Sequence, residues 1–327
     1  MLLDVCGAFD RLWSQGLIYK LLKWRLPLRL LRCVASFVRE RSLRVFEGSA
    51  ISDEIIMKAG TPQGSIISPI LFLLFMDDVK DDLPEGVIIY QFADDIALST
   101  TASCPRLAKW RLQKGLEVIK KWTSKWRIEL EPKKSNFLLF SRCPTHRRLS
   151  LNLNLHGIQI VETTKARFLG ILLDNKLDWS CQIDDLLNRT MHKIHLLKNI
   201  SAKDRWTNPR QVLKFFDAII TSIFAFVIPN CISMKASLWN KMDKAHARAV
   251  KSIAGVPNFT NYQTVCDHLG IEKWSLSLKR AALERIGGIL RSSPVGNKMI
   301  SNAPKSKQTY DSPVFQYLKY KLEERAA

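Results

Sequence analysis

Residues 87–98, Val-Ile-Ile-Tyr-Gln-Phe-Ala-Asp-Asp-Ile-Ala-Leu, place two adjacent carboxylates inside an apolar run. The flanks, Val87 to Phe92 and Ile96 to Thr100, predict two strands joined at Ala93-Asp94-Asp95. Two carboxylates at the tip of a buried hairpin repel each other and lose solvation, which is costly. A divalent cation with oxygen ligands is the natural compensation. This stretch therefore points to a metal site on a β-hairpin, with a solvated acidic pair as the alternative.

A third carboxylate, Asp4, ends another apolar segment, which is expected to be a short buried strand over residues 1–6. Beside the hairpin, Asp4 would complete a site for two Mg²⁺ ions. Such ions lie about 3.5–4 Å apart and stabilise the attacking and leaving oxygens of a phosphoryl displacement. Asp10 lies in a helix-like segment and is expected to cap a helix or form a salt bridge. The Asp pairs at 77–78, 81–82 and 184–185 are expected on the solvated surface.

The composition favours a globular intracellular protein. The chain has 327 residues, of which 46% are apolar and 24% charged, so wholesale disorder is excluded. Its seven cysteines form no Cys-x-x-Cys pair, which argues against a disulfide scaffold or zinc ribbon and favours a reducing compartment. The N-terminal residues lack a signal-peptide pattern. The longest apolar stretch, Phe215 to Met234, is interrupted by Asp217 and Pro229 and is expected to be a buried helix, with no membrane contact. We expect the protein to be located in the cytoplasm and nucleus.

The net charge of +20 is unevenly distributed along the chain. Residues 1–100 carry a net charge of −2, residues 101–150 carry +10, and residues 201–327 carry +11. A near-neutral first part followed by a basic remainder favours a polyanionic partner, usually a nucleic acid. The alternative is a well-solvated basic surface.

Hydrophobic periodicity predicts a mixed α/β part followed by a helical part, with a boundary near residue 180. Helices are expected at 17–38 with a break at Pro27, at 68–79, at 106–125, and from 183 onward. Strands are expected at 136–141, 149–155, 158–161 and 167–173. Later helix breaks are expected at Asn208-Pro209, Pro229, Gly255-Val256-Pro257 and Gly287-Gly288. Residues 293–313 have the composition of a loose linker.

Five short motifs follow one another between residues 3 and 179. They are Leu3-Asp4-Val5-x-x-Ala8-Phe9-Asp10, Gly60-Thr61-Pro62-Gln63-Gly64-Ser65-x-x-Ser68-Pro69, Phe92-Ala93-Asp94-Asp95, Leu130-x-Pro132-x-Lys134-Ser135-x-x-x-Leu139-Phe140, and Phe168-Leu169-Gly170-Ile171-x-Leu173-Asp174 with Leu177-x-Trp179. In this order they resemble motifs A to E of the reverse transcriptases of non-LTR (LINE-type) retrotransposons. The residues within these motifs are most similar to those of the jockey-like elements of insects. Residues 185–290 resemble the C-terminal part of those polyproteins more loosely.

The resemblance implies a role for each motif. The implied catalytic residues are Asp4, Asp94 and Asp95, which together with Val5 are the implied ligands of two Mg²⁺ ions, with Mn²⁺ as a possible substitute. The implied contacts of the incoming dNTP are Phe9, Gln63, Gly64 and Lys134. Phe9 matches a steric gate against a 2′-hydroxyl, and Lys134 matches a lysine that protonates pyrophosphate. Phe168, Leu169 and Gly170 match a hairpin that grips the primer end.

Alternatives stay open for several of these residues. Phe9 is otherwise a core aromatic, and Phe168 to Gly170 are otherwise part of an ordinary strand. Lys133 competes with Lys134, because a shift of one residue exchanges them. Basic side chains within 109–125 and 193–205 are expected near template–primer phosphates, although any one of them is otherwise a solvated surface charge.

The implied fold is α+β. A right-hand polymerase palm, with an antiparallel sheet backed by helices, is expected over residues 1–180. A helical, basic thumb and C-terminal region is expected over 181–292, and a loose linker with a terminal helix over 293–327. Because the chain begins inside the first motif, the fingers and endonuclease regions are expected to be missing.

The implied function is RNA-directed DNA polymerisation on an RNA template with a DNA primer and dNTPs. The alternative is a truncated, inactive nucleic-acid-binding relic of the same element. Phe9 and Ala93 argue against a viral RNA-dependent RNA polymerase, and the ordered motifs argue against an unrelated two-metal nuclease. The sequence leaves the oligomeric state open.

Overall fold

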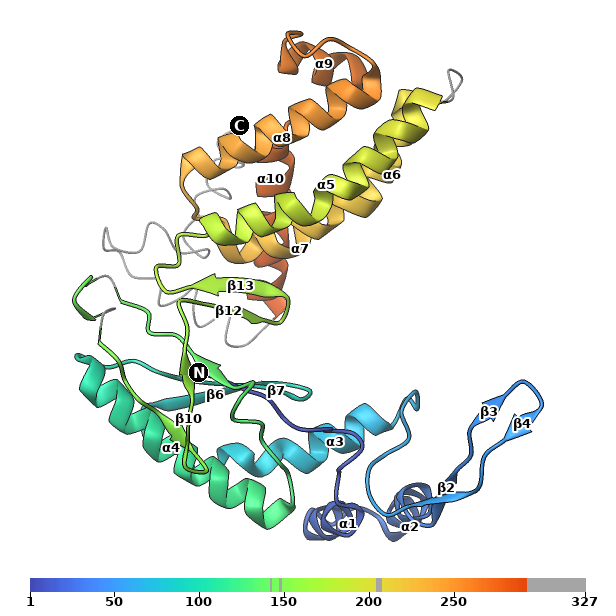
Figure 1. The fold of residues 1–327 in the computed structure, drawn as a ribbon, viewed down its shortest axis with the longest axis vertical. Helices are drawn as coiled ribbons and strands as arrows, with labels where there is room; N and C mark the ends of the chain where they lie inside the picture. The colour runs from blue at the N-terminus through green and yellow to red at the C-terminus, as the bar shows by residue number, and fades with distance from the viewer. Residues whose placement is uncertain (142, 147–148, 204–207, 293–327) are drawn as a thin grey trace. The chain divides into compact units, whose positions relative to one another are not determined.

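The computed structural model describes residues 1–141, 143–146, 149–203 and 208–292 (Figure 1). The chain forms two compact units, one made of residues 1–170 with 174–176 and the other of residues 171–173 with those from 177 onward. The first unit combines a small sheet with helices, and the described part of the second is almost entirely helical. The predicted α+β class is therefore confirmed.

A five-stranded sheet organises the first unit. Its strands, in spatial order, are β11 (Val161–Glu162), β8 (Asn136–Phe137), β1 (Leu2–Leu3), β7 (Asp95–Thr100) and β6 (Val87–Phe92). Strand β1 is antiparallel to both of its neighbours, and β11 runs parallel to β8. Strands β6 and β7 form the predicted hairpin, which is thus confirmed. The register places Leu3 opposite Ile96.

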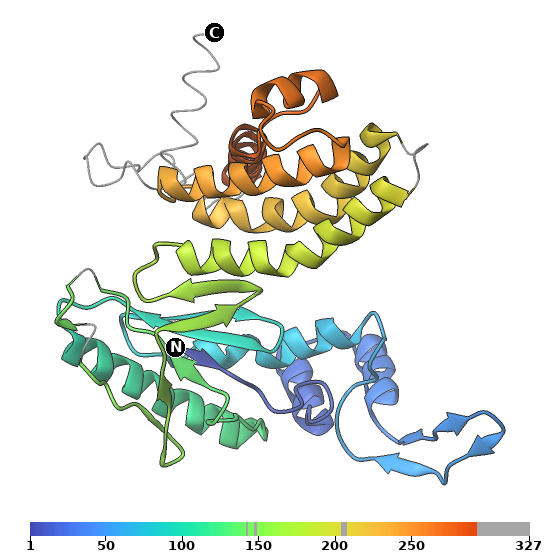
Figure 2. The same ribbon diagram turned by 45° about the horizontal axis from the view of Figure 1, so that its top comes forward.

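The first unit has helices where the periodicity predicted them. They are α1 (Ser14–Lys23), α2 (Leu28–Val38), α3 (Ser68–Met76) followed by the 3₁₀ turn η1 (Asp77–Lys80), and α4 (Pro105–Trp126). The predicted break at Pro27 is confirmed, since the proline directly precedes α2. Helix α4 lies along one face of the sheet (Figures 1 and 2). Gly115 permits this close approach, because an added Cβ would lie 3.1 Å from Val87 Cγ1.

The core of the first unit lies between the sheet and these helices. Leu3, Ile96 and Leu98 from the sheet pack with Leu116 of α4 and Phe72 of α3. Burial of each such side chain contributes about 1.5–3 kcal/mol. On the strand farthest from β11, Ile88, Tyr90 and Phe92 are exposed. Helices therefore cover one face of this part of the sheet, and the other face is open.

A buried lysine ties three elements of this core together. Lys20 of α1 lies with its Nζ 2.5 Å from Asp78 Oδ1 in η1 and 3.8 Å from the ring centroid of Trp126 in α4. The Trp122 indole N–H donates to the same Asp78 oxygen. Burial lowers the pKa of Lys20, and Asp78 opposes that shift. This ion pair with its aromatic surround was not visible in the sequence.

The remaining strands form small hairpins. An exposed arm consists of β2 (Arg41–Leu43), β3 (Phe46–Glu47), β4 (Ala50–Ile51) and β5 (Ile55–Met57), and it projects away from the sheet in Figure 1. Two further pairs are β9 (Asn154–Leu155) with β10 (Ile158–Gln159), and β12 (Lys165–Phe168) with β13 (Ile171–Asp174).

Two predicted strands are shorter than the sequence suggested. Within 136–141 only Asn136–Phe137 is a strand, and within 149–155 only Asn154–Leu155 is. Leu151, Leu153 and Leu155 are all buried, so the alternation does mark an inward-facing side. A strand also needs a pairing partner, however, and alternation carries no information about that partner.

The second unit is built from helices. They are α5 (Ser180–Lys203), α6 (Pro209–Phe216), the π-helical turn η3 (Asp217–Thr221), α7 (Ser222–Cys231), α8 (Ala236–Ala254), α9 (Tyr262–Leu269) and α10 (Trp274–Ser292). Asn208 caps α6 by accepting the Arg210 N–H, and Gly255 ends α8 with φ of 68°. These two predicted breaks are therefore confirmed.

The breaks predicted at Pro229 and Gly287-Gly288 are wrong, because α7 and α10 continue through them. Pro229 lies in the last turn of α7, where it removes only one backbone hydrogen bond. The two glycines cost about 1 kcal/mol each in a helix interior. Ile286 and Leu290 are buried in the core of this unit, and their packing outweighs that cost.

By length and composition alone, one helical stretch among the described residues, Pro209–Cys231, could cross a bilayer. Core helices of soluble proteins pass the same test. Phe216, Ile220 and Phe224 of this stretch are fully buried in the core of the second unit. One face of the stretch therefore packs in that core, while Phe215 and Phe226 on it are exposed.

Candidate active site

The β6–β7 hairpin presents two of the predicted carboxylates at its turn. Phe92 pairs with Asp95, so Ala93 and Asp94 form a two-residue turn. Ala93 has φ of 53°, a left-handed conformation that costs a non-glycine residue about 1–2 kcal/mol. Strain of this kind clusters at functional sites. The chain thus accepts a strained residue next to the Asp pair.

Strand β1 brings the third carboxylate to the same place. Because Leu3 pairs with Ile96, the next residue, Asp4, leaves β1 beside Asp95. Burial raises the pKa of Asp95, and the charges of Asp94 and Asp4 raise it further. The repulsion that the sequence predicted for Asp94 and Asp95 therefore includes Asp4, more than ninety residues away.

The three carboxylates suit a divalent cation in kind and in place. As their side chains stand, the described residues contain no group of three or more His, Cys, Asp or Glu that could hold a metal ion. The backbone nevertheless converges, and carboxylate oxygens whose charges repel are the donors that Mg²⁺ accepts. Asp94 and Asp95 are exposed and Asp4 is half-buried, so none of the three side chains is locked in place by core packing.

Val5 directly follows Asp4 and has only its backbone to offer a metal. Its side chain is buried, and it bridges Leu130 in an antiparallel pair. The hydrogen bonds of that bridge are made by the Cys6 N–H and by the Asp4 carbonyl. The Val5 carbonyl takes no part in the bridge and is the group that Val5 could offer to a metal.

The segment after α4 holds Asp4 in place and brings Lys134 to it. The Glu131 N–H donates to the Asp4 carbonyl at 2.9 Å, and the Asp4 N–H donates to Ser135 Oγ at 3.3 Å. Lys134 Nζ lies 3.9 Å from Asp4 Oδ2. Both lysines are held to Glu131 through their backbone N–H groups, Lys133 at Oε1 and Lys134 at the carbonyl oxygen, so only the ammonium contact with Asp4 distinguishes them. This geometry favours Lys134 over its neighbour.

The loop before α3 is locked against the segment that follows Asp4. The Gly60 N–H donates to the Leu12 carbonyl, and the Thr61 N–H donates to the Phe9 carbonyl, both at 2.8 Å. Gly60 has φ of +86°, and an added Cβ would lie 2.6 Å from the Asp10 carbonyl oxygen. Only glycine allows this approach. Gly60 lies in the quoted motif, but nothing local in the sequence showed which backbone it would meet.

Gln63 and Asp10 meet across the same junction. The Gln63 Nε2–H donates to Asp10 Oδ1 at 2.8 Å. Asp10 therefore orients Gln63 instead of capping a helix or forming a salt bridge, and this differs from the expectation for Asp10. Gly64 is exposed, has φ of +84°, and has open space where a side chain would lie.

Phe9 lies between the core and the surface. Its ring centroid is 5.1 Å from that of Phe72, and the side chain is partly buried against the core. Packing thus fixes the ring, and part of it stays accessible.

Phe168, Leu169 and Gly170 form the end of β12 and the turn after it. Leu169 and Gly170 have φ of 48° and 80°, which is the left-handed pair typical of a two-residue hairpin turn. The Gly170 carbonyl accepts a hydrogen bond from the Arg167 guanidinium. Of the three, only Phe168 lies in a strand.

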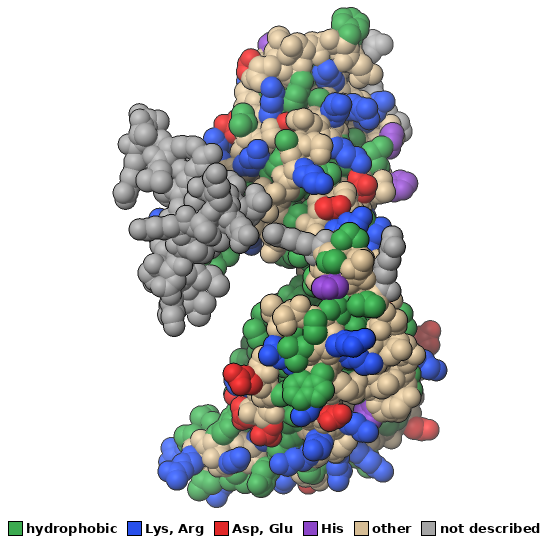
Figure 3. All heavy atoms as spheres, turned by 90° about the vertical axis from the view of Figure 1, so that its left-hand side faces the viewer, with side chains coloured by type: hydrophobic (Ala, Val, Ile, Leu, Met, Phe, Trp, Pro, Cys, Tyr) green, Lys and Arg blue, Asp and Glu red, His purple; other side chains and the backbone are tan. Residues whose placement is uncertain are grey.

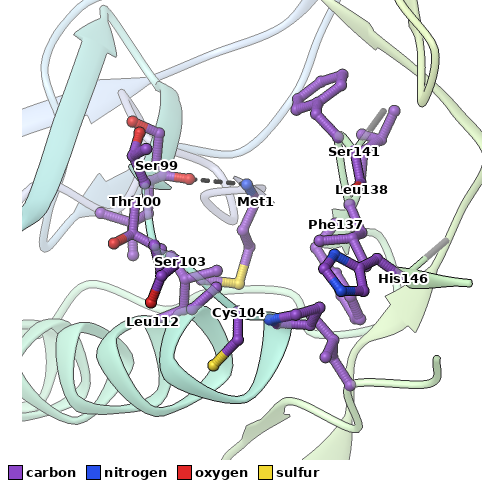
Figure 4. A pocket seen from close by; sticks show the side chains of 18 residues that line it. Met1, Ser99, Thr100, Ser103, Cys104, Leu112, Phe137, Leu138, Ser141 and His146 are labelled. Carbon is purple, nitrogen blue, oxygen red and sulfur yellow. Dashed lines mark hydrogen bonds between the residues drawn. The ribbon is translucent and has the colours of Figure 1, made fainter. Parts of the chain in front are cut away.

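A cavity of about 330 Å³ lies near the other end of β7 (Figure 4). Its lining includes Met1, Thr100, Cys104 and His146, and the Met1 ammonium donates to the Leu98 carbonyl at 2.7 Å. None of the predicted site residues lines this cavity. The candidate active site is therefore the exposed end of the sheet and not this cavity.

Comparison with known proteins agrees with the motifs. The reverse transcriptase (RNA-dependent DNA polymerase) family matches residues 1–173. An "RNA-directed DNA polymerase from mobile element jockey" of Drosophila funebris is 27% identical over 277 residues, which is 81% of this chain and 29% of that protein. The protein of the same name in Drosophila melanogaster is 26% identical over 298 residues, covering 86% of this chain and 31% of that protein.

A third relative is the "Probable RNA-directed DNA polymerase from transposon X-element" of Drosophila melanogaster, 27% identical over 256 residues. That match covers 77% of this chain and 27% of the relative. The chain thus spans about a third of the length of the curated relatives it matches. The predicted resemblance to the jockey-like elements is confirmed. With the family match over more than half of its length, the chain belongs to the reverse transcriptase family.

Proposed function

We propose that this chain is the catalytic part of an RNA-directed DNA polymerase of a non-LTR retrotransposon. It would transfer a nucleotidyl group from a dNTP to the 3′-hydroxyl of a DNA primer on an RNA template. One observation carries the proposal: the sheet register brings Asp4 beside Asp95, and their charges and that of Asp94 act on one another. Three carboxylates at one sheet end suit chemistry on phosphates.

The residues around the carboxylates supply complementary functions. Asp4, Asp94, Asp95 and the Val5 carbonyl would hold two Mg²⁺ ions, or Mn²⁺. When bound, these ions supply stabilisation of charge on the reacting oxygens. Lys134, whose ammonium is paired with the Asp4 carboxylate at 3.9 Å, would protonate the leaving pyrophosphate.

Recognition of the nucleotide would fall to the two segments that meet at Gly60. Gln63, oriented by Asp10, would donate a hydrogen bond to the incoming dNTP. Gly64 would let the nucleotide approach the backbone closely. The fixed ring of Phe9 would exclude a 2′-hydroxyl by steric repulsion.

The two units support a division of labour. In the first, a sheet with helix α4 on one face and exposed residues on the other suits a right-hand polymerase palm. The second, helical and basic, suits a thumb and C-terminal region, and the turn at Phe168 to Gly170 suits contact with the primer end. The predicted linker and terminal helix at 293–327 fall outside the described residues. Because its template and primer are intracellular nucleic acids, the protein would act in the cytoplasm and nucleus.

The test is DNA synthesis on an RNA template annealed to a DNA primer. Wild-type chain, Asp94→Asn and the matched control Asp82→Asn, which changes an exposed Asp away from the hairpin, are compared in Mg²⁺. We expect Asp94→Asn to lower incorporation of dNTPs by about 10²–10³-fold or more, and Asp82→Asn to leave it unchanged. Equal activity of all three, or no incorporation by the wild type, would reject the proposal.

A further inference from the structure

A groove of about 750 Å³ lies within the second unit between α5 and α8. These helices pack side by side (Figures 1 and 2). Leu187, Met191 and Ile194, spaced along one face of α5, line the groove together with Val256 and Pro257 after α8. Its floor is therefore apolar, although it is open to solvent.

Cations border this apolar floor. Lys244, Arg248 and Lys251 follow one another along α8 at helical spacing, and Lys198 and His195 face them from α5. Lys241 also lines the groove, but its Nζ lies 2.5 Å from Asp184 Oδ1, so its charge is already paired. Within the described ranges, no ion pair joins Lys198, Lys244 or Arg248 to a carboxylate. Figure 3 shows one face of the molecule, on which Lys and Arg side chains lie among apolar ones.

The cationic ridge of α8 also borders a second hollow. Lys244, Arg248 and Lys251 line an adjoining cavity of about 630 Å³ with Lys273 and Asn258. The carboxylate of Asp243 also lines this cavity and accepts the Ser275 N–H, so its four basic side chains outnumber one acidic one. The three basic side chains of α8 therefore line both the groove and the adjoining cavity. The positively charged surface extends beyond the groove itself.

An exposed aromatic residue directly follows the last residue that lines the groove. Phe259 is 92% exposed and directly follows Asn258, which lines both hollows. The Lys251 ammonium donates to the Asn258 carbonyl at 2.8 Å and fixes the start of the loop. A phenylalanine exposed to this degree has no packing role in the unit. Its face is available to a flat apolar ligand.

We infer that the α5–α8 groove binds single-stranded RNA. A positive groove with exposed aromatic and apolar surface is what unpaired strands need, because phosphates contact the cations and bases stack on the rings. Bases of a duplex are stacked on each other and cannot reach the floor. The choice of RNA over DNA rests on the proposed function, since an RNA template is single-stranded ahead of the site of synthesis.

The test is binding of a fluorescent oligo(U) of about 12 nucleotides to the full chain, followed by anisotropy. The titrations use EDTA, no dNTP, and an Asp94→Asn background, so they do not depend on polymerase activity. Contacts to about three phosphates predict a slope near −2 in log affinity against log salt, or roughly 20-fold weaker binding between 50 and 200 mM salt.

Two variants separate the charged and stacking parts. Lys244→Glu with Arg248→Glu should weaken binding by about tenfold or more and flatten the salt slope by about 1.4. Phe259→Ala should weaken binding about 5- to 100-fold with an unchanged slope. The control is Arg285→Glu with Arg291→Glu, which removes the same charge from exposed positions on α10 that do not line the groove. Circular dichroism confirms that each variant is folded.

Several results would overturn the inference. Equal loss in the α10 control would mean that only overall charge matters. Equal affinity for a duplex, or no effect of Phe259→Ala, would remove the single-strand assignment, and equal affinity for oligo(dT) would remove the RNA assignment. No binding of oligo(U) by the chain with an unaltered groove, together with intact primer extension by the wild type, would reject this inference alone. Intact binding without extension would reject only the proposed function.

Discussion

At the scale of single residues, Asp95 is the carboxylate of the candidate active site whose pKa is shifted by its surroundings. Burial and the charges of Asp94 and Asp4 raise its pKa, so its ionised form is disfavoured in the folded chain. A raised carboxyl pKa means that the folded state binds more protons than the unfolded state as pH passes through the interval between the two pKa values. Stability therefore falls as pH rises through that interval, and the whole penalty is present above it.

This sign gives a prediction for Asp95→Asn. In EDTA at pH 7 the variant should have a higher Tm than the wild type, because the penalty of the charge is gone. The difference should shrink as pH falls toward the ordinary Asp value. Added Mg²⁺ should stabilise the wild type more than the variant. Differential scanning fluorimetry measures all three effects, and a lower Tm of the variant in EDTA would contradict the electrostatic account.

Lys134 gives a second prediction at this scale. Its ammonium lies 3.9 Å from Asp4 Oδ2, and no ion pair between Asp4 and Lys133 is found among the described residues. Because a general acid contributes about 10²–10⁴-fold, Lys134→Ala should lower the rate of nucleotide incorporation about 10²-fold and lose a limb of the pH–rate profile. Lys133→Ala serves as the matched control. The reverse order of effects would show that the motif is shifted by one residue.

At the scale of elements, the parts that could be predicted are those with a strong local signal. The β6–β7 hairpin, α3 and α4 follow from apolar runs, and the break at Pro27 follows from proline chemistry. The lengths of the strands at 136–137 and 154–155 were overestimated, because the extent of a strand depends on a pairing partner that can be distant in sequence. For the same reason no pattern indicated the burial of Lys20 or the contact of Gln63 with Asp10.

The loop at Gly60 allows a test of such a long-range contact. Gly60→Ala would place a methyl group against the Asp10 carbonyl in a left-handed conformation, and should lower the free energy of unfolding by about 2–4 kcal/mol. Gly64→Ala shares the left-handed conformation but has open space, and should cost only about 1–2 kcal/mol. Urea unfolding followed by tryptophan fluorescence compares them. Equal costs would mean that Gly60 does not meet the segment after Asp4.

At the scale of the whole molecule, the carboxylates of the candidate site and the excess positive charge lie in different parts of the chain. The carboxylates of the candidate site lie within residues 1–100, whose net charge is −2, and the positive excess lies mostly in 101–150 and 201–327. This distribution suits an enzyme whose catalytic end holds metal ions and whose other surfaces hold phosphates. The sequence placed Asp4, Asp94 and Asp95 at the ends of apolar strands, and the sheet brings those strand ends together; their role as metal ligands remains a prediction. The sequence did not predict the α5–α8 groove, which forms only when two helices about fifty residues apart pack together.

The central claim is that Asp4 and the Asp94–Asp95 pair form one metal site. Electron paramagnetic resonance of free Mn²⁺ during titration of the chain measures this directly. We predict about two Mn²⁺ ions per wild-type chain, competed by Mg²⁺, with binding lost in both Asp4→Asn and Asp94→Asn and retained in Asp82→Asn. Unchanged Mn²⁺ binding by Asp4→Asn would contradict the claim, because the carboxylate from β1 would then not belong to the site.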